Sequence, residues 1–156
     1  MGGLTQGWPA VLVLVAGVLS GMLGVGGLED LARPGLRLGV SVIDCLKGLW
    51  EDACGRAGLV EPVRRNISYR ANGCIAIVEA VAAGEVDVAF GWTAFRHLAP
   101  GRIEVMELPE EVQVKRGTGV ALLEFSRRPE EAERFMDFLV TPEVRAFYRE
   151  YGWTDP

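Results

Sequence analysis

The stretch SVIDCLKGLW at residues 41–50 decides the fold, together with a second stretch that runs from Tyr69 to Trp92. In each, an apolar strand pattern breaks into a polar turn with Gly and Cys, and a helical pattern follows. Two strand ends that feed two helix starts place backbone N–H groups and positive dipole ends in one crevice, which suits an anion. In open α/β sheets, ligands bind at that edge. The pattern therefore favours a small-ligand binding protein over an enzyme.

Composition limits the class of protein. The chain has 156 residues, 49% of them hydrophobic, so it is long enough for one domain or a domain and a half with a real core. Its formal net charge is −5, and no Lys/Arg cluster offsets that balance. An acidic chain without a basic patch has no electrostatic footprint for nucleic acid. We therefore expect no nucleic-acid partner.

The N-terminal segment is uncharged up to Glu29, the first ionisable side chain. Residues 9–27 are apolar and rich in Gly, and three interpretations compete. They are a buried strand at Val11–Val15 followed by a glycine loop, a transmembrane helix of just sufficient length, or a degenerate signal peptide. The signal peptide is not convincing, because no Lys or Arg precedes the apolar run. Composition changes sharply at Glu29, which marks a predicted domain boundary.

Beyond Glu29, strand and helix patterns alternate. This alternation predicts an α/β fold with three layers, in which helices cover both faces of a mostly parallel sheet. Ser126 is expected to cap the helix at 129–140. The expected helices and helical turns are 28–32, 47–57, 74–83, 94–98, 129–140 and a last helix from Thr141 to Gly152. The expected strands are 36–43, 66–70, 86–90, 103–108 and 119–125.

Several segments carry a family resemblance when their order and spacing are taken together. They are LEDLARPG at 28–35, Gly73-Cys74 before a helix, VAAGEVDVAFGW at 81–92, PEEAERFMDFL at 129–139, Thr141-Pro142-Glu143 and Tyr151-Gly152-Trp153. From about Leu28 to Trp153, the chain resembles the second half of the molybdate/tungstate-type solute-binding proteins of ABC transporters. These are type II periplasmic binding proteins, which hold an oxyanion between two α/β lobes.

The resemblance implies an organisation and a function. Residues 1–27 would form an apolar hinge strand and glycine loop or a membrane-associated segment, 28–111 the ligand-binding lobe, and 112–156 a return strand and C-terminal helices. The family's first-lobe opening has no counterpart here, so the chain is a fragment, works with half a cleft, or receives that lobe from another chain. We expect a periplasmic or extracytoplasmic, membrane-associated protein that binds a small anion and docks on a membrane permease. A homodimer through the N-terminal apolar segment and the C-terminal helices is a further expectation.

The resemblance also implies which residues face the ligand. They are Lys47 and Gly48 in the turn before the first helix, Gly73 and Cys74 at the start of the next, and Trp92 after the strand. Lys47 would supply positive charge, or it is an exposed first-turn lysine. Trp92 stands where molybdate binders usually have a tyrosine, and it either donates its indole N–H to the ligand or packs at the lobe edge.

The three cysteines have separate interpretations. Cys45 and Cys74 lie in the two turns that converge at the cleft, whereas Cys54 lies inside a helix and is expected to be buried. Three alternatives are open for Cys45 and Cys74: a disulfide between them, two reduced and packed thiols, or a pair that binds a soft metal ion or reacts. We therefore place Cys45 among the candidate ligand-binding residues.

No pattern of catalytic residues is present. His97 is the one histidine, in a surface turn, and the sequence has no zinc-protease, nucleophile-elbow or phosphate-loop motif. We therefore expect no enzyme, no cofactor and no resident metal ion. Two other interpretations remain besides an oxyanion carrier: a ligand-sensing regulatory domain of the same fold, and a thiol enzyme that uses Cys45 or Cys74.

Overall fold

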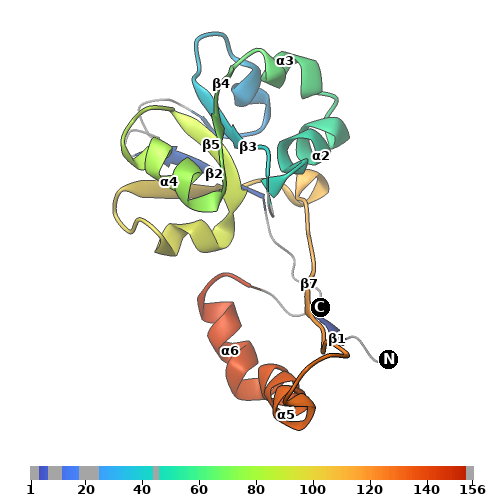
Figure 1. Ribbon diagram of the computed structural model, residues 1–156. Coiled ribbons are helices and arrows are strands. Elements are labelled where there is room, and N and C mark those ends of the chain that lie inside the picture. Colours follow the sequence, from blue (N-terminus) through green and yellow to red (C-terminus); the bar gives the residue numbers. More distant parts are fainter. Residues whose placement is uncertain (1–3, 7–11, 18–24, 44–45, 154–156) are drawn as a thin grey trace. The chain divides into compact units, whose positions relative to one another are not determined.

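The structure is a computed structural model, and it describes residues 4–6, 12–17, 25–43 and 46–153. The chain divides into two compact units (Figure 1). Unit 1 comprises Met1–Ala10 and Lys115–Pro156, and unit 2 comprises Val11–Val114. The chain therefore passes between the units twice. The domain limits expected from the sequence remain a prediction.

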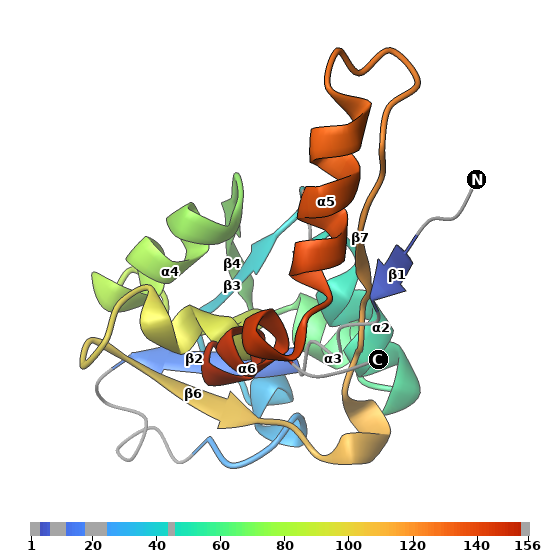
Figure 2. The ribbon, with the colours of Figure 1, turned by 90° about the horizontal axis from the view of Figure 1, so that it is seen from below.

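Unit 2 is built on a five-stranded sheet in the order β4-β3-β5-β2-β6. The strands are β2 (Leu12–Gly17), β3 (Leu38–Ser41), β4 (Ile67–Ala71), β5 (Val88–Trp92) and β6 (Ile103–Glu107). β3 is parallel to β4 and β5, whereas β2 is antiparallel to both of its neighbours, β5 and β6. The strands β2 and β6 lie side by side in Figure 2. Four strands thus share one direction, which confirms the predicted mostly parallel sheet.

Helices cover the sheet because of the order in which its strands connect. From β3, the chain passes through α2 (Leu49–Arg56) and α3 (Val60–Arg64) to β4, and it then returns through α4 (Cys74–Ala82) to β5. These two crossovers run in opposite directions along the sheet, so right-handed connections place their helices on opposite faces. Figure 1 shows α4 lying across the strands. The predicted three-layer α/β class is confirmed.

The core of unit 2 follows from the strand sequences. All of β3 is buried, and Leu38, Val40 and Val88 are fully inaccessible to solvent. On the other side of β3, Gly39 allows α4 to approach closely, because a Cβ there would lie 2.7 Å from Cδ1 of Ile77. Short 3-10 helices complete the unit: η1 (Glu29–Ala32), η3 (Thr93–His97) and η4 (Glu110–Val112).

The structure describes part of the apolar N-terminal segment as a strand. β2 spans Leu12–Gly17, close to the predicted Val11–Val15, and pairs on both sides within the sheet. Residues 18–24, where the glycine loop was expected, lie outside the described residues. Within the described ranges, no helix combines the length and apolar character needed to span a membrane.

Unit 1 contains two short strands and two helices. β1 (Leu4–Gln6) pairs antiparallel with β7 (Thr118–Val120). α5 (Pro129–Leu139) and α6 (Pro142–Glu150) follow, and Thr141 caps α6 by accepting the N–H of Val144 at 3.5 Å. Both C-terminal helices were predicted.

Three predictions of local structure need correction, and one helix was missed. The strand expected at 119–125 is found instead at Thr118–Val120, as β7, which pairs with β1. Ser126 does not cap α5: the N-cap residue is Arg128, whose N–H the Ser126 hydroxyl accepts at 3.3 Å. The sequence prediction missed α3, a five-residue helix. Trp92 belongs to β5 rather than to the turn after it, because the strand continues to pair with Leu12.

Candidate functional site

The candidate site lies at the edge of the unit 2 sheet where three parallel strands end. Ser41, the last residue of β3, is in register with Ala71, the last residue of β4. Gly39 is in register with Ala89, so β5 ends at the same edge. The segments that leave these three strands, which begin at Val42, Asn72 and Thr93, therefore start from the same edge of the sheet.

Buried polar side chains gather at this edge. Among the side chains that the structure describes, Ser41 and Thr93 are the two buried polar residues, at 3% and 5% exposure. Ser41 ends β3, and Thr93 follows β5 directly. Buried polar groups are informative because each must be satisfied by a partner. Sequence reasoning missed both, and the available signal was a hydroxyl residue directly after an apolar strand.

Ser41 joins two of the turns. Its Oγ accepts the backbone N–H of Gly73 at 3.2 Å, in a buried position, and donates to the carbonyl of Ile43 at 3.5 Å. One hydroxyl thus ties the turn after β3 to the start of α4. The two stretches that decide the fold are linked here by a direct hydrogen bond.

The N-terminus of α4 suits an anion. Gly73 is its buried N-cap residue, with φ at 107°, and Cys74, half-buried, begins the helix. All of α4 lies within the described residues, and it starts without a side-chain cap and without an acidic residue in its first turn. Its first N–H groups and its dipole are therefore not neutralised by a carboxylate of the helix itself.

The N-terminus of α2 is less suited to an anion. Gly48 precedes it with φ at 74°, and Lys47 is exposed just before. Glu51 and Asp52, however, occupy the first turn of α2 and already offer negative charge to its dipole. Of the two predicted anion-binding turns, the start of α4 is the better one.

Trp92 has a different environment from the one expected of a residue exposed in a cleft. It is buried, with 7% exposure, as the last residue of β5. Its contact with a ligand remains a prediction. Thr93, the next residue, brings a hydroxyl to the same edge.

Of the three cysteines, the structure describes Cys54 and Cys74. Cys45 lies outside the described residues, so its relation to Cys74 remains a prediction with the same three alternatives. Cys54 is fully buried in α2, as predicted. Burial, together with the negative charge of Glu51, raises the pKa of the Cys54 thiol to about 12, so this thiol stays protonated and unreactive.

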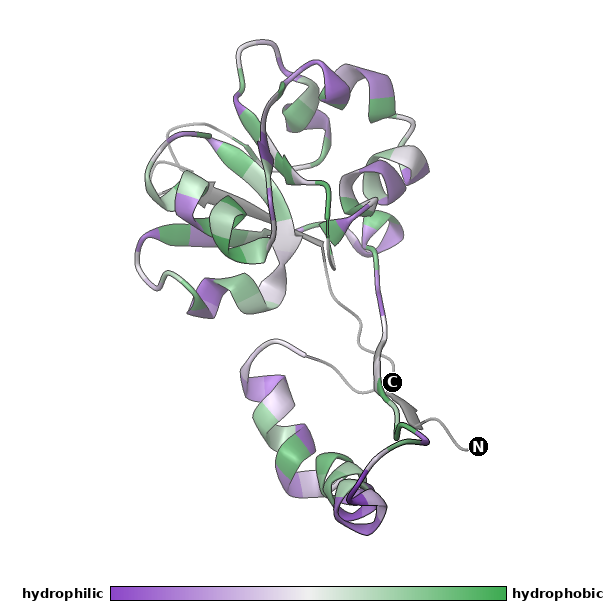
Figure 3. Cartoon of the chain, in the orientation of Figure 1, coloured by the Kyte–Doolittle hydropathy of each residue, from purple (hydrophilic) through white to green (hydrophobic). Residues whose placement is uncertain are grey.

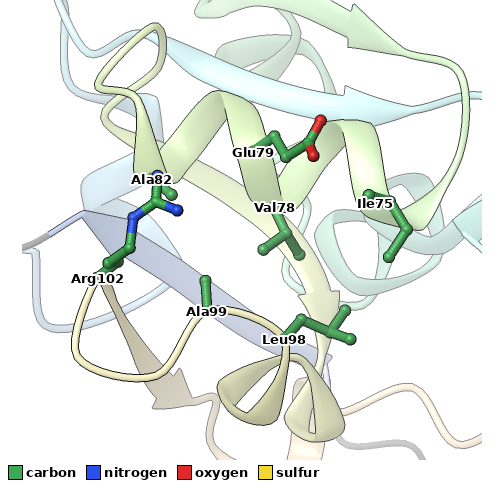
Figure 4. Close-up of a pocket in the computed structure, with 7 residues that line it drawn as sticks. All are labelled: Ile75, Val78, Glu79, Ala82, Leu98, Ala99 and Arg102. Carbon is green, nitrogen blue, oxygen red and sulfur yellow. The ribbon is translucent and has the colours of Figure 1, made fainter.

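A shallow hollow lies elsewhere on unit 2. Its volume is about 130 Å³, and it separates the flank of α4 from the turn after η3 (Figure 4). It is lined by Ile75, Val78, Glu79, Ala82, Leu98, Ala99 and Arg102. None of the predicted ligand-binding residues lines it.

In the parts of the chain that are described, no group of three or more His, Cys, Asp or Glu side chains is arranged to hold a metal ion.

Solved structures with the same fold include the following three. PEB3 of Campylobacter jejuni, solved with bound L-phospholactate, is 20% identical and has a TM-score of 0.81, over 99% of this chain and 68% of that one. The periplasmic molybdate-binding protein of Azotobacter vinelandii is 20% identical, with a TM-score of 0.71 over 97% and 66% of the two chains. The sulfate-binding protein SubI of Mycobacterium tuberculosis H37Rv is 14% identical, with a TM-score of 0.78 over 97% and 57%.

These similarities confirm the type II periplasmic-binding-protein fold that the sequence resemblance implied. A comparison with curated protein sequences gives no match. The family model of the bacterial extracellular solute-binding proteins matches residues 8–154, almost the whole chain. The chain therefore belongs to the family of bacterial extracellular solute-binding proteins.

Proposed function

We propose that this chain is the solute-binding component of an ABC transporter and binds a small oxyanion at the start of α4. The observation that supports this most is the α4 N-terminus, which carries no side-chain cap and no acidic first-turn residue. A helix N-terminus of this kind offers several N–H donors and a positive dipole end to one anion. Gly73 brings the backbone close to the ligand, and Ser41 fixes Gly73 in place.

The chemistry of the similar structures supports an oxyanion rather than a neutral solute. Their names report L-phospholactate, molybdate and sulfate, which all carry several negatively charged oxygen atoms. We propose a molybdate-like or tungstate-like ligand for this chain. Gly48, Lys47, Cys45, Cys74 and Trp92 remain proposed contacts around it.

The partners and location follow from the same proposal. A solute-binding component works outside the cytoplasmic membrane and delivers its ligand to a membrane permease. We therefore propose a periplasmic or extracytoplasmic, membrane-associated protein whose partner is an ABC permease. A homodimer is proposed as well, because exposed apolar side chains gather on the C-terminal helices.

A thermal-shift panel tests the ligand. Molybdate, tungstate, sulfate, phosphate and Cd²⁺ are added separately, with and without reductant, because a ligand that binds only the folded state raises the melting temperature. Stabilisation by an oxyanion regardless of reductant supports the proposal. Stabilisation by Cd²⁺ alone, and only when reduced, would assign the site to Cys45 and Cys74 instead.

A charge placed in the first turn of α4 tests the position of the site. Ala76→Glu adds a carboxylate there, where it favours the helix dipole but repels an anion. Ala82→Glu, at the other end of α4, is the matched control, since Ala76 and Ala82 are both half-buried. We expect Ala76→Glu to weaken oxyanion binding at least about tenfold while Ala82→Glu leaves it unchanged. Equal affinities would remove the α4 N-terminus from the site.

A further inference from the structure

The segment through which the chain returns from unit 2 to unit 1 is held by unit 2. It comprises residues 108–114, which we call the return connection, and Lys115 begins the second stretch of unit 1. Leu108, Val112 and Val114 are buried. η4, within this segment, contacts α2, and Figure 3 shows hydrophobic residues alternating with hydrophilic ones along it. The return connection is therefore packed into unit 2 and is not a free linker.

Arg56, in the last turn of α2, bonds to the return connection. Its guanidinium group donates a hydrogen bond to the backbone carbonyl of Gln113. The side chain of Gln113 donates in turn to the carbonyl of Leu108 at 2.7 Å. A charged donor forms a stronger hydrogen bond than a neutral one. The return connection is thus closed on itself by Gln113 and fixed to α2 by Arg56.

Arg96, in η3, holds the start of the same segment. Its Nε donates to the backbone carbonyl of Thr93 at 3.1 Å, and its Nη2 donates to the carboxylate of Glu107 at 3.1 Å. Glu107 is the last residue of β6 and directly precedes the return connection. An exposed ion pair alone contributes little stability, but this guanidinium group also holds the backbone of Thr93. Arg96 therefore joins the start of η3 to the start of the return connection.

We propose that Arg56 and Arg96 are positioning residues that make unit 2 rigid as far as Val114, so that this crossing of the chain bends at residues 115–117. These three residues have no regular secondary structure, and a hinge needs only a few such residues to absorb the change in backbone angles. A guanidinium group suits the task, because its planar fork carries several donors and can bond two groups at once.

The same two residues connect the return connection to the candidate site. α2 follows β3 and η3 follows β5, and both strands end at the edge of the sheet where the candidate site lies. The solute site and the return connection therefore belong to one rigid body, and any movement of the solute site is passed on to the residues that enter unit 1. The proposal does not depend on which solute unit 2 binds.

Nuclear magnetic relaxation of the 15N-labelled, unaltered chain tests where the bend lies. We expect backbone order parameters of about 0.85 in the return connection, as in rigid backbone, and below about 0.6 at residues 115–117. Low order parameters that already begin before Val114, or high ones that continue through residue 117, overturn the proposal. This measurement requires no variant, so it holds even if a substitution prevents folding.

Amide hydrogen exchange in Arg56→Ala tests whether the anchor causes the rigidity. Val112 and Gln113 are the reporters, because their N–H groups donate to carbonyls of the return connection at 3.0 and 3.3 Å. We expect both amides to exchange at least about tenfold faster in Arg56→Ala and near the parent rate in Arg56→Lys, which keeps a charged donor. Arg65→Ala is the matched control, since Arg65 is also exposed and lies at the end of the next helix, α3.

Exchange of the α4 amides separates a local effect from a general one. We expect it to stay at the parent rate in Arg56→Ala, in Arg96→Ala and in the control variant, while Arg96→Ala accelerates the same two reporter amides as Arg56→Ala. Reporter amides that exchange at the parent rate in Arg56→Ala overturn the proposal, because buried side chains alone would then hold the segment. An equal acceleration in α4 or in Arg65→Ala also overturns it, because the substitution would then have loosened unit 2 as a whole.

Discussion

Removing the hydroxyl of Ser41 tests how the candidate site is held together. In Ser41→Ala, the buried N–H of Gly73 loses the acceptor that it has at 3.2 Å, and no water can easily replace it at a position that is 3% exposed. A buried donor left without a partner costs about 1–3 kcal/mol of unfolding free energy. Alanine fills nearly the same volume, so the cavity term is small.

Urea unfolding monitored by circular dichroism measures this cost. We expect a lower midpoint for Ser41→Ala with an unchanged slope, which indicates lost stability in an unaltered fold. Ser68→Ala is the matched control, since Ser68 is exposed on the neighbouring strand β4 and its loss should stay within about 0.5 kcal/mol. The same two variants are then tested for oxyanion affinity, and only Ser41→Ala should lose it.

A result in which Ser41→Ala is as stable as Ser68→Ala would refute the reasoning. The Gly73 N–H would then have found another acceptor, and the bond between the two turns would not organise the site. Lost stability with unchanged affinity would separate the two roles: Ser41 would hold the fold together, and the ligand would bind without help from Gly73.

Three further predictions concern unit 2. Gly39→Ala should lower the unfolding free energy by about 1–3 kcal/mol, because the added Cβ would overlap a side chain of α4. Gly55→Ala should raise it by about 0.5–1 kcal/mol, because Gly55 lies inside α2 with open space around it. Urea unfolding compares the two variants, and equal effects would contradict the tight β3–α4 contact. Burial opposes ionisation of Asp87, but hydrogen bonds from the side chain and backbone of Arg37 outweigh burial and lower the pKa of Asp87. The Arg37–Asp87 pair therefore stabilises the fold above the ordinary carboxyl pKa, and this contribution is lost below about pH 4. Asp87→Asn should therefore be less stable than the parent at neutral pH and approach it in acid, and parallel pH profiles of thermal unfolding would argue against the pair. Cys54 should resist a thiol reagent at pH 8 until the chain unfolds, since burial raises its pKa to about 12, and peptide mapping that finds it modified as fast in the native state would contradict its burial.

Local sequence patterns predicted the elements that depend on local interactions. The helix expected at 74–83 is α4 at Cys74–Ala82, because its apolar residues repeat with helical spacing and Gly84 ends it with φ at 74°. The end of β5 was misplaced because its last residue pairs with Leu12, which lies far away in the sequence. The segment of α3 is too short for a helical period to appear in it.

The site was predicted as a region but not as a set of contacts. The turns around Lys47 and Gly73 were identified because glycine, cysteine and a helix start leave a visible pattern. Ser41 and Thr93 were missed because a hydroxyl residue after a strand is common. Whether such a hydroxyl contributes to the site depends on which strands are neighbours. That β3 lies beside β4, so that Ser41 reaches Gly73, is a consequence of strand order that no local pattern contains.

The C-terminal helices show the same limit at the level of assembly. Their spacing of Phe135, Phe138, Phe147 and Tyr151 predicts that each helix has an apolar face that must be covered. The free energy gained by covering it depends on area and hardly on the identity of the covering surface, so the sequence of one helix cannot distinguish its partners. What distinguishes them is shape and stoichiometry, which belong to the complex. For this reason, the mass of the chain in solution decides between a second copy and any other cover for α5 and α6, and it does so independently of whether the α4 N-terminus binds an oxyanion.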